Sequence, residues 1–245
     1  QSNNMQAGIS DLFTTLLVQR GIGVYNDEQT ATNFDKPEAV DAFKTSMQFF
    51  TQSTLPDVFD FYNRFRSGEM PLGIQPYTEF NKLSAAAPEI RNLWTMVPIP
   101  GTPQEDGTIS RAQPGTGTAA AMFGHMRDNE DAWTFLRWWT SAEAQERYGR
   151  DLEMIMGLAA RYTPANTQAM ERLPWSNSEL DNLMAQWEQA VEIPTLPASY
   201  YLTRGLTNAF RNVLYNNENP REALSYQNRL INKEITRKRA ELGLD

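Results

Sequence analysis

The sequence contains no cysteine and a single histidine, His125, among its 245 residues. Disulfides, thiolate metal sites and cysteine nucleophiles are therefore excluded. Metal sites that need two histidines, and most catalytic triads, are excluded for the same kind of reason. We interpret His125 as a surface or capping residue, because it follows a predicted strand and precedes a polar turn. The sequence predicts no metal site and no cofactor.

Further signatures of catalysis and of membrane insertion are missing. There is no phosphate-cradling G-x-x-x-x-G-K motif and no G-x-S-x-G motif. The carboxylates show no spacing that separates a catalytic pair from surface charge, so an enzyme is not predicted. No run of about 18 apolar residues occurs, and we therefore predict no membrane-spanning helix. The first four residues contain neither Met nor an apolar signal segment, and we expect the chain to be part of a longer parent.

Positive charge is scarce: 22 Lys and Arg stand against 30 Asp and Glu, giving a formal net charge of −8. Nucleic-acid binding needs clustered basic side chains, and the densest basic run covers only residues 237–239. Glu234 and Glu241 balance that run, so we interpret it as a solvated helix face. Aromatic residues, by contrast, make up 11% of the chain, and Trp and Tyr suit a surface that stacks ligands.

Apolar periodicity indicates α/β architecture, in which helices are separated by a few short buried strands. The strands are predicted at residues 70–74, 93–99 and 118–123. Capping residues, glycines and prolines bound the expected helices, which cover residues 9–20, 35–50, 61–68, 77–83, 130–139, 166–173, 178–188, 199–215 and 220–242, with one more helix expected directly after residue 139. The helix after residue 139 is expected to begin with a capping box at Thr140 and Glu143.

Five stretches, taken in order, resemble one family. Residues 65–74 are similar to its F-x-x-G-x-x-a-M segment, and residues 93–101 are similar to the strand that follows. Residues 132–148 resemble its A-W-x-F-L-x-W-x-T-S-x-x-x-Q helix pair, and residues 197–201 and 219–224 complete the order. The family is that of the bacterial extracellular solute-binding proteins, the maltose-binding-protein-like family 1, which delivers sugars to ABC importers.

The resemblance implies a periplasmic-binding-protein-like fold of type II, helix-rich with a short central sheet and made mainly of the C-terminal lobe. Residues 1–112 and 163–245 would form that lobe, and residues 113–162 would belong to the N-terminal lobe. Most of the N-terminal lobe has no counterpart in this sequence and is expected as a partner. Hinges are expected near residues 113–117 and 163–165, where Gly and Pro occur.

The function implied is non-catalytic binding of a sugar or oligosaccharide between two lobes that close by hinge motion. The expected partners are the ligand and the membrane permease of an ABC importer. The expected location is extracellular, as a membrane-anchored lipoprotein, or periplasmic. The sequence does not name the solute.

A sugar-binding site needs aromatic platforms and a few fixed polar groups. Tyr200 and Arg204 stand at i and i+4 near the start of a predicted helix, so they share a face. Tyr201 adjoins them, and the resemblance implies that this helix start lines a cleft. The alternative is a pair of tyrosines packed between helices.

Four further residues are candidates for the ligand site. Gln75 and Tyr77 follow a predicted strand at its C-terminal end, where α/β folds bind ligands, or Tyr77 packs in a turn against the next helix. Asp11 and Phe13 align with a helix that lines the cleft in the family.

Two other functions stay open at this stage. A carbohydrate-active, glycosidase-like enzyme or its remnant requires a close pair of cleft carboxylates. A helical interaction domain would instead cover Tyr200 and Arg204 by packing.

Overall fold

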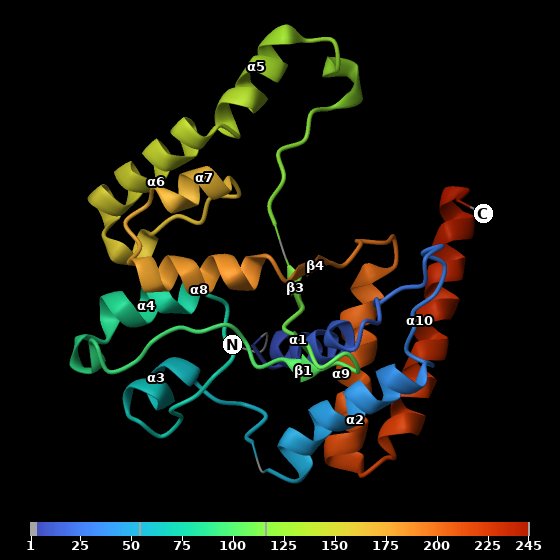
Figure 1. The fold of residues 1–245 in the computed structure, drawn as a ribbon. Helices are drawn as coiled ribbons and strands as arrows, with labels where there is room; N and C mark the ends of the chain where they lie inside the picture. The colour runs from blue at the N-terminus through green and yellow to red at the C-terminus, as the bar shows by residue number, and fades with distance from the viewer. Residues whose placement is uncertain (1–3, 54, 116, 245) are drawn as a thin grey trace. The chain divides into compact units, whose positions relative to one another are not determined.

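The computed structural model describes residues 4–53, 55–115 and 117–244, with side chains described from residue 11 onward. The chain forms two compact units, each assembled from separate stretches of sequence (Figure 1). Unit 1 contains residues 1–59, 100–115 and 186–245, and unit 2 contains residues 60–99 and 116–185. Both units are built mainly of helices, as the sequence predicts.

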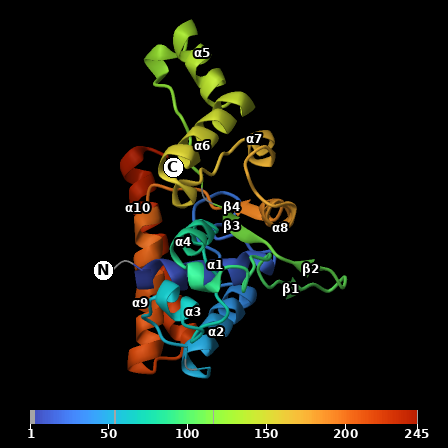
Figure 2. The ribbon, with the colours of Figure 1, turned by 90° about the vertical axis from the view of Figure 1, so that its left-hand side faces the viewer.

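Unit 1 consists of four long helices and two small sheets. Its elements are α1 (Asn4–Gln19), α2 (Pro37–Thr51), β1 (Thr102–Pro103), β2 (Ile109–Ser110), β3 (Gln113–Gly115), β4 (Ala190–Glu192), α9 (Ser199–Asn216) and α10 (Pro220–Leu242). Strands β1 and β2 pair antiparallel, and β3 and β4 pair parallel. Figure 2 shows β1 and β2 as a hairpin that extends away from the helices of this unit.

The core of unit 1 is rich in aromatic side chains. Phe13 of α1 meets Phe34 and Phe43 edge to face, at ring-centroid distances of 5.2 and 5.5 Å. Phe210 of α9 meets Phe50 of α2 in the same way at 5.0 Å. Edge-to-face pairs of this kind add to the gain from burying apolar area, so they fix α1, α2 and α9 against one another.

Unit 2 is made of shorter helices. These are α3 (Phe61–Arg66), α4 (Thr78–Ala86), α5 (Glu130–Trp139), α6 (Ala142–Met156), α7 (Thr167–Glu171) and most of α8 (Asn177–Trp187). Phe80 of α4 packs against Trp94 and Trp175 at 5.3 Å from each. The guanidinium of Arg161 lies 4.6 Å from the Trp175 ring and forms two hydrogen bonds with the Glu153 carboxylate, at 2.7 and 2.9 Å. Within the described residues, no helix is long and apolar enough to cross a membrane.

The predicted helices are confirmed, and side-chain caps explain several of their first residues. The side chains of Asn129 and Asn166 accept hydrogen bonds from backbone N–H groups in the first turns of α5 and α7. One start differs from the prediction: Ser141, not Thr140, caps α6, by accepting from the Ala144 N–H. Thr140 instead ends α5 and bonds back to its carbonyls.

The three predicted buried strands are wrong as strands and wrong as buried segments. Residues 70–74, 93–99 and 118–123 are extended but join no sheet among the described residues. Leu72 is 85% exposed and Phe123 is 78% exposed. A strand needs a neighbouring strand to satisfy its backbone groups, and the described part of the chain supplies none for these segments.

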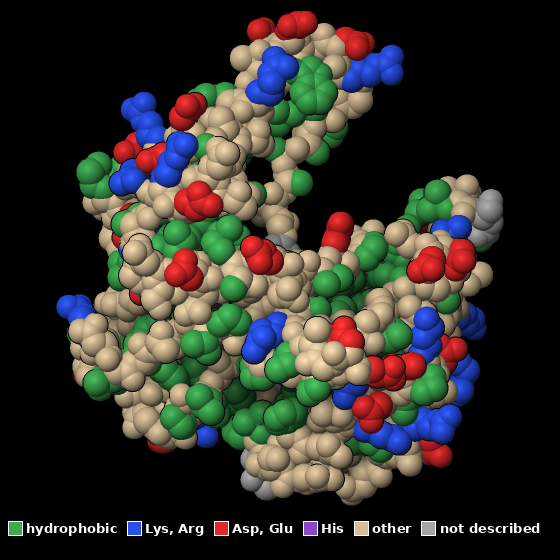
Figure 3. Space-filling model, viewed as in Figure 1, with side chains coloured by type: hydrophobic (Ala, Val, Ile, Leu, Met, Phe, Trp, Pro, Cys, Tyr) green, Lys and Arg blue, Asp and Glu red, His purple; other side chains and the backbone are tan. Residues whose placement is uncertain are grey.

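Apolar side chains also reach the surface along α5, which has no buried residue. Figure 3 shows hydrophobic groups at the surface of this helix, beside charged groups. The large exposed side chains on it are Trp133, Phe135 and Trp138. Unit 2 therefore exposes apolar groups of the size that elsewhere form a core.

The compact units do not reproduce the residue groups predicted for the two lobes. A unit boundary falls at Gly115, close to the first predicted crossing. The predicted return at residues 162–166, however, lies inside unit 2, and residues 60–99 belong to unit 2 as well. The assignment of residues to the lobes of a larger protein therefore stays a prediction.

Backbone hydrogen exchange tests the extended segments. Amides in residues 71–74, 94–98 and 118–123 donate no hydrogen bond to any described residue, so we expect them to exchange at nearly the rate of an unstructured peptide. Peptides from α9 and α10 are the internal control and exchange far more slowly. Mass spectrometry of deuterium uptake measures both, and slow exchange in the three segments would mean that their amides are paired after all.

The aromatic core of unit 1 predicts the effect of a truncation. Replacing fully buried Phe210 by Ala should lower the free energy of unfolding by about 3–5 kcal/mol, because it removes a core ring and leaves a cavity. The matched control is Phe49→Ala, since Phe49 is 45% exposed, and its cost should stay below about 1 kcal/mol. Urea denaturation followed by circular dichroism measures both, and equal costs would argue against this core.

Candidate ligand-binding site

One face of α9 carries a row of polar side chains that lines a groove. Tyr200, Arg204 and Arg211 follow one another at helical spacing, and the predicted sharing of a face by Tyr200 and Arg204 is realised. Thr203, Thr207 and Asn208 fill the positions between them along the groove. We call these six residues the α9 groove.

The opposite face of α9 is apolar and determines which way the groove faces. Leu206, Phe210 and Val213 are buried in the core of unit 1. Gly205 lies directly against α10: a Cβ atom there would come within 2.7 Å of the Ile231 Cδ1 atom. A larger residue at position 205 would force the Ile231 side chain to shift, so glycine allows α9 to pack closely on α10 with its polar face outward.

Tyr200 is held by a charged network on α10. Its hydroxyl donates to the Glu234 carboxylate, which also accepts from the Arg237 guanidinium at 2.6 and 2.9 Å. Hydrogen bonds from Arg237, and then from Tyr200, lower the pKa of Glu234 to about 2. The hydrogen bond to Glu234 in turn raises the pKa of Tyr200. The ring is 58% exposed, so its hydroxyl is anchored while much of its surface stays open.

Tyr201 serves the neighbouring core and orients Arg204. Its ring is partly buried against the core of unit 1, and it meets Tyr200 edge to face at 6.1 Å. The Arg204 guanidinium lies 5.7 Å from the centre of the Tyr201 ring. Cation–π contacts of this length hold an arginine loosely in place, so Tyr201 acts through Arg204 and does not line the groove.

The two candidate ligand contacts on α1, Asp11 and Phe13, differ in their exposure. Phe13 is 1% exposed and lies inside the aromatic core, so the prediction that it lines a cleft is corrected: it is a core residue. Asp11, two residues earlier on the helix, is exposed. Partial burial of its carboxyl raises the pKa of Asp11.

Gln75 and Tyr77 belong to unit 2 and form no part of the α9 groove. Gln75 is exposed in an extended segment, whereas Tyr77 is partly buried at the start of α4. Burial, and then the nearby Tyr162, raise the pKa of Tyr77 to about 12. Such a shift marks a desolvated hydroxyl, which agrees with the alternative that Tyr77 packs in a turn.

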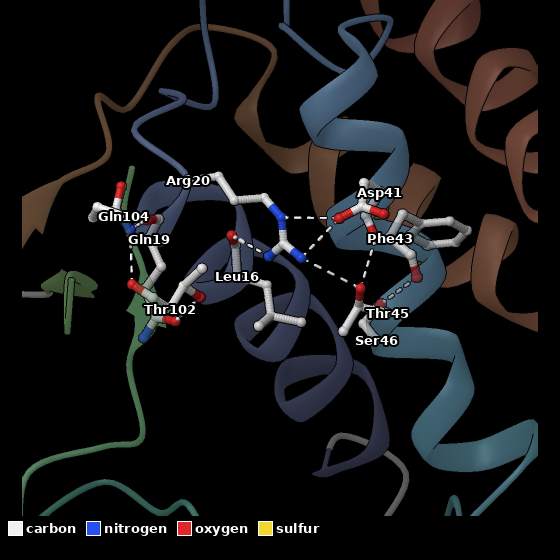
Figure 4. Close-up of polar contacts among 9 residues, drawn as sticks. All are labelled: Leu16, Gln19, Arg20, Asp41, Phe43, Thr45, Ser46, Thr102 and Gln104. Atoms are coloured by element: carbon white, nitrogen blue, oxygen red, sulfur yellow. Dashed lines mark hydrogen bonds and ion pairs between the residues drawn. The ribbon is translucent and has the colours of Figure 1, made fainter. Parts of the chain in front are cut away.

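A second depression on unit 1 is lined in part by side chains that are hydrogen-bonded within the protein, and Figure 4 shows these bonds. Arg20, on its wall, donates to the Asp41 carboxylate at 2.9 and 3.2 Å and to the Leu16 carbonyl at 3.0 Å. The Gln104 side chain donates to the Gln19 carbonyl at 2.9 Å. These groups connect α1 with α2 and with the β1 region, so we assign them a structural role.

Four residues of the groove were not predicted from the sequence: Thr203, Thr207, Asn208 and Arg211. Arg211 could have been found, because it lies seven residues after Arg204 and therefore on the same helical face. The others carry no signal in a sequence, since Thr and Asn are common on any exposed helix. Among the described residues, no group of three or more His, Asp or Glu side chains is arranged to hold a metal ion.

No protein-family model matches the chain, and no curated protein matches it. Solved structures do. The sugar-binding protein MalE from Xanthomonas citri is similar with a TM-score of 0.75 and 14% identity, over 96% of this chain and 58% of that one. The maltose-binding periplasmic protein MalE from Listeria monocytogenes, in complex with maltose, is similar with a TM-score of 0.60 and 17% identity, over 94% and 59%.

A third similar structure is an ABC-transporter solute-binding protein from Thermotoga lettingae bound with α-D-tagatose, with a TM-score of 0.62 and 17% identity. That comparison covers 92% of this chain, but only 56% of the neighbour's. At such identities the likeness concerns the fold. The chain therefore has the predicted periplasmic-binding-protein-like fold of ABC-transporter solute-binding proteins, over somewhat more than half of their length.

Proposed function

We propose that the chain binds a sugar or oligosaccharide as part of the substrate-binding component of an ABC importer. One observation carries the proposal: the exposed Tyr200 ring, anchored through its hydroxyl, stands beside the outward-facing guanidinium of Arg204. The fold supports it, because the similar structures described above are solute-binding proteins of sugar transport.

The chemistry of the α9 groove suits a sugar. A pyranose has an apolar C–H face that stacks on an aromatic ring, and hydroxyls that need fixed hydrogen-bond partners. Tyr200 offers the ring, and Arg204 offers a planar set of N–H donors that can hold two neighbouring oxygens. Asn208, which is half-buried one turn further on, offers both a donor and an acceptor.

The proposal includes no catalysis. No carboxylate is among the side chains that line the groove, whereas a glycosidase-like enzyme requires a close pair of them. The third function that the sequence left open, a helical interaction domain, requires Tyr200 and Arg204 to be covered, and both are exposed. Binding without chemistry is the function that agrees with these groups.

We further propose that the rest of the ligand site, and the cover for the exposed segments of unit 2, come from another stretch of polypeptide in a longer parent. The chain spans 56–59% of the length of the similar structures. Residues 70–74, 93–99 and 118–123 are extended, apolar and without strand partners among the described residues. A missing N-terminal lobe would supply such strands, and hinges near residues 113–117 and 163–165 would let the lobes close on the ligand.

In this proposal the closed form is what the membrane permease of the importer recognises. The parent would then act outside the cytoplasmic membrane, as an anchored lipoprotein or in the periplasm. Asp11, Gln75 and Tyr77 remain proposed ligand contacts that depend on how the complete parent is assembled.

The α9 groove predicts a specific loss of affinity. Tyr200→Ala should weaken binding of a stacked sugar by about 1–3 kcal/mol, because a stacking contact is lost. Saturation-transfer NMR against a panel of neutral and acidic oligosaccharides would find the ligand, since it detects binding as weak as about 1 mM. Tyr226→Ala, on an exposed tyrosine of α10 outside the groove, is the control. An unchanged affinity for Tyr200→Ala would dismiss this site, and a panel without any binder would dismiss the function.

The proposal of a longer parent makes a prediction about the molecular mass of the protein in cells. An antibody raised against this chain should detect, in cells that express the gene, a protein well above the 27.9 kDa of the 245 residues. The recombinant chain on the same gel is the size control. A single band at the position of the recombinant chain would contradict the proposed parent and leave the unit 2 segments to be explained by another partner.

A further inference from the structure

The α9 groove contains two guanidinium groups without a counter-charge. Arg204 and Arg211 form neither an ion pair nor a side-chain hydrogen bond with any described residue, and Arg204 contacts the Tyr201 ring alone through its guanidinium. Both are exposed. Their positions differ by seven residues, which corresponds to about 10 Å along the helix axis.

Near both ends of the row, a carboxylate is hydrogen-bonded to a tyrosine of α9. At one end, the Tyr200 hydroxyl and Arg237 occupy Glu234. At the other end Tyr215, one turn beyond Arg211, donates its hydroxyl to the Asp57 carboxylate. The two tyrosines stand before and after the two arginines along α9, and each donates a hydrogen bond to a carboxylate that forms no ion pair with Arg204 or Arg211.

Two other arginines of unit 1 do have carboxylate partners. Arg20 is neutralised by Asp41, and Arg237 by Glu234 and Glu241. The chain carries an excess of acidic residues, with a formal net charge of −8, so acidic partners are abundant in its composition. Arg111, Arg221 and Arg229 also form no ion pair with any described residue, so what sets Arg204 and Arg211 apart is that both line the same groove beside Tyr200.

We propose that the ligand of the α9 groove is an acidic oligosaccharide, with carboxylate groups on its sugar units. This inference rests on the proposed sugar-binding function and specifies the class of sugar. A guanidinium and a carboxylate can form two parallel hydrogen bonds in one plane, and a neutral hydroxyl cannot reproduce this geometry. Arg204 and Arg211 stand about two helical turns apart on α9, so we take the ligand to have acidic groups on at least two units.

The remaining groups of the groove fit an elongated ligand. The Thr207 hydroxyl donates to the Thr203 carbonyl at 2.8 Å and the residue is only 4% exposed, so it offers a ligand little contact. The Asn208 side chain, between the two arginines, makes no hydrogen bond with any described residue and can pair with a sugar hydroxyl. Tyr200 stacks one ring of the ligand at the end of the row.

A matched pair of ligands tests the charge. Trigalacturonate and its fully methyl-esterified form have the same rings, and the ester has lost its negative charges. We expect the 245-residue chain to bind the acid at least tenfold more tightly than the ester, as saturation-transfer titration would measure. Equal affinities, or tighter binding of the ester, would overturn the acidic class while leaving the sugar function intact. Binding of neither compound, nor of any sugar in the panel, would overturn both proposals.

Charge-neutralising variants test the residues. Arg211→Gln and Arg204→Gln should each reduce affinity for trigalacturonate by about tenfold, since a charge-assisted hydrogen bond is lost. Arg221→Gln, an exposed arginine at the start of α10 and outside the groove, is the matched control and should bind like the original chain. If Arg221→Gln weakens binding as much as the groove variants do, the effect comes from overall charge and the proposed site is wrong.

Discussion

The contact between Gly205 and Ile231 is the constraint on which the rest of unit 1 depends. It brings α9 and α10 so close together that a Cβ at position 205 would displace the Ile231 side chain. With α10 on one side and the Phe50–Phe210 contact with α2 on another, α9 has no freedom to rotate about its axis. Interiors packed at this density transmit small changes, so the outward direction of the polar face is a consequence of the apolar packing beneath it.

This packing also places Glu234 of α10 where the Tyr200 hydroxyl can reach it. A tyrosine without such a partner would move between rotamers and would lose more entropy when a ligand stacked on it. The network thus prepares the ring for binding. It has an electrostatic consequence as well, because a carboxylate occupied by Arg237 and Tyr200 is not available to pair with Arg204.

The helices could be predicted from the sequence because their signals are local. Apolar spacing, caps such as Asn129 and breaks such as Gly68 lie within a few residues of each helix end. The strand predictions failed because strand pairing depends on residues far away in the sequence. Residues 70–74 have the composition of a buried strand, yet a strand exists only where a second one lies beside it. The same limit explains Phe13. Its alignment with a cleft helix was visible, but its burial depended on Phe34 and Phe43, which lie elsewhere in the sequence.

An acidic ligand poses a physical question, because the chain as a whole is negatively charged. Long-range attraction cannot guide an anion to such a surface, and beyond the screening length of about 8 Å at physiological salt the mean field is weak in any case. Affinity must then come from contacts inside the groove. Bidentate pairing with a guanidinium is strong and depends on geometry, so it distinguishes acidic sugars from the many small anions that a positively charged surface would collect. The excess of acidic residues elsewhere therefore favours selectivity, at the expense of the rate of association.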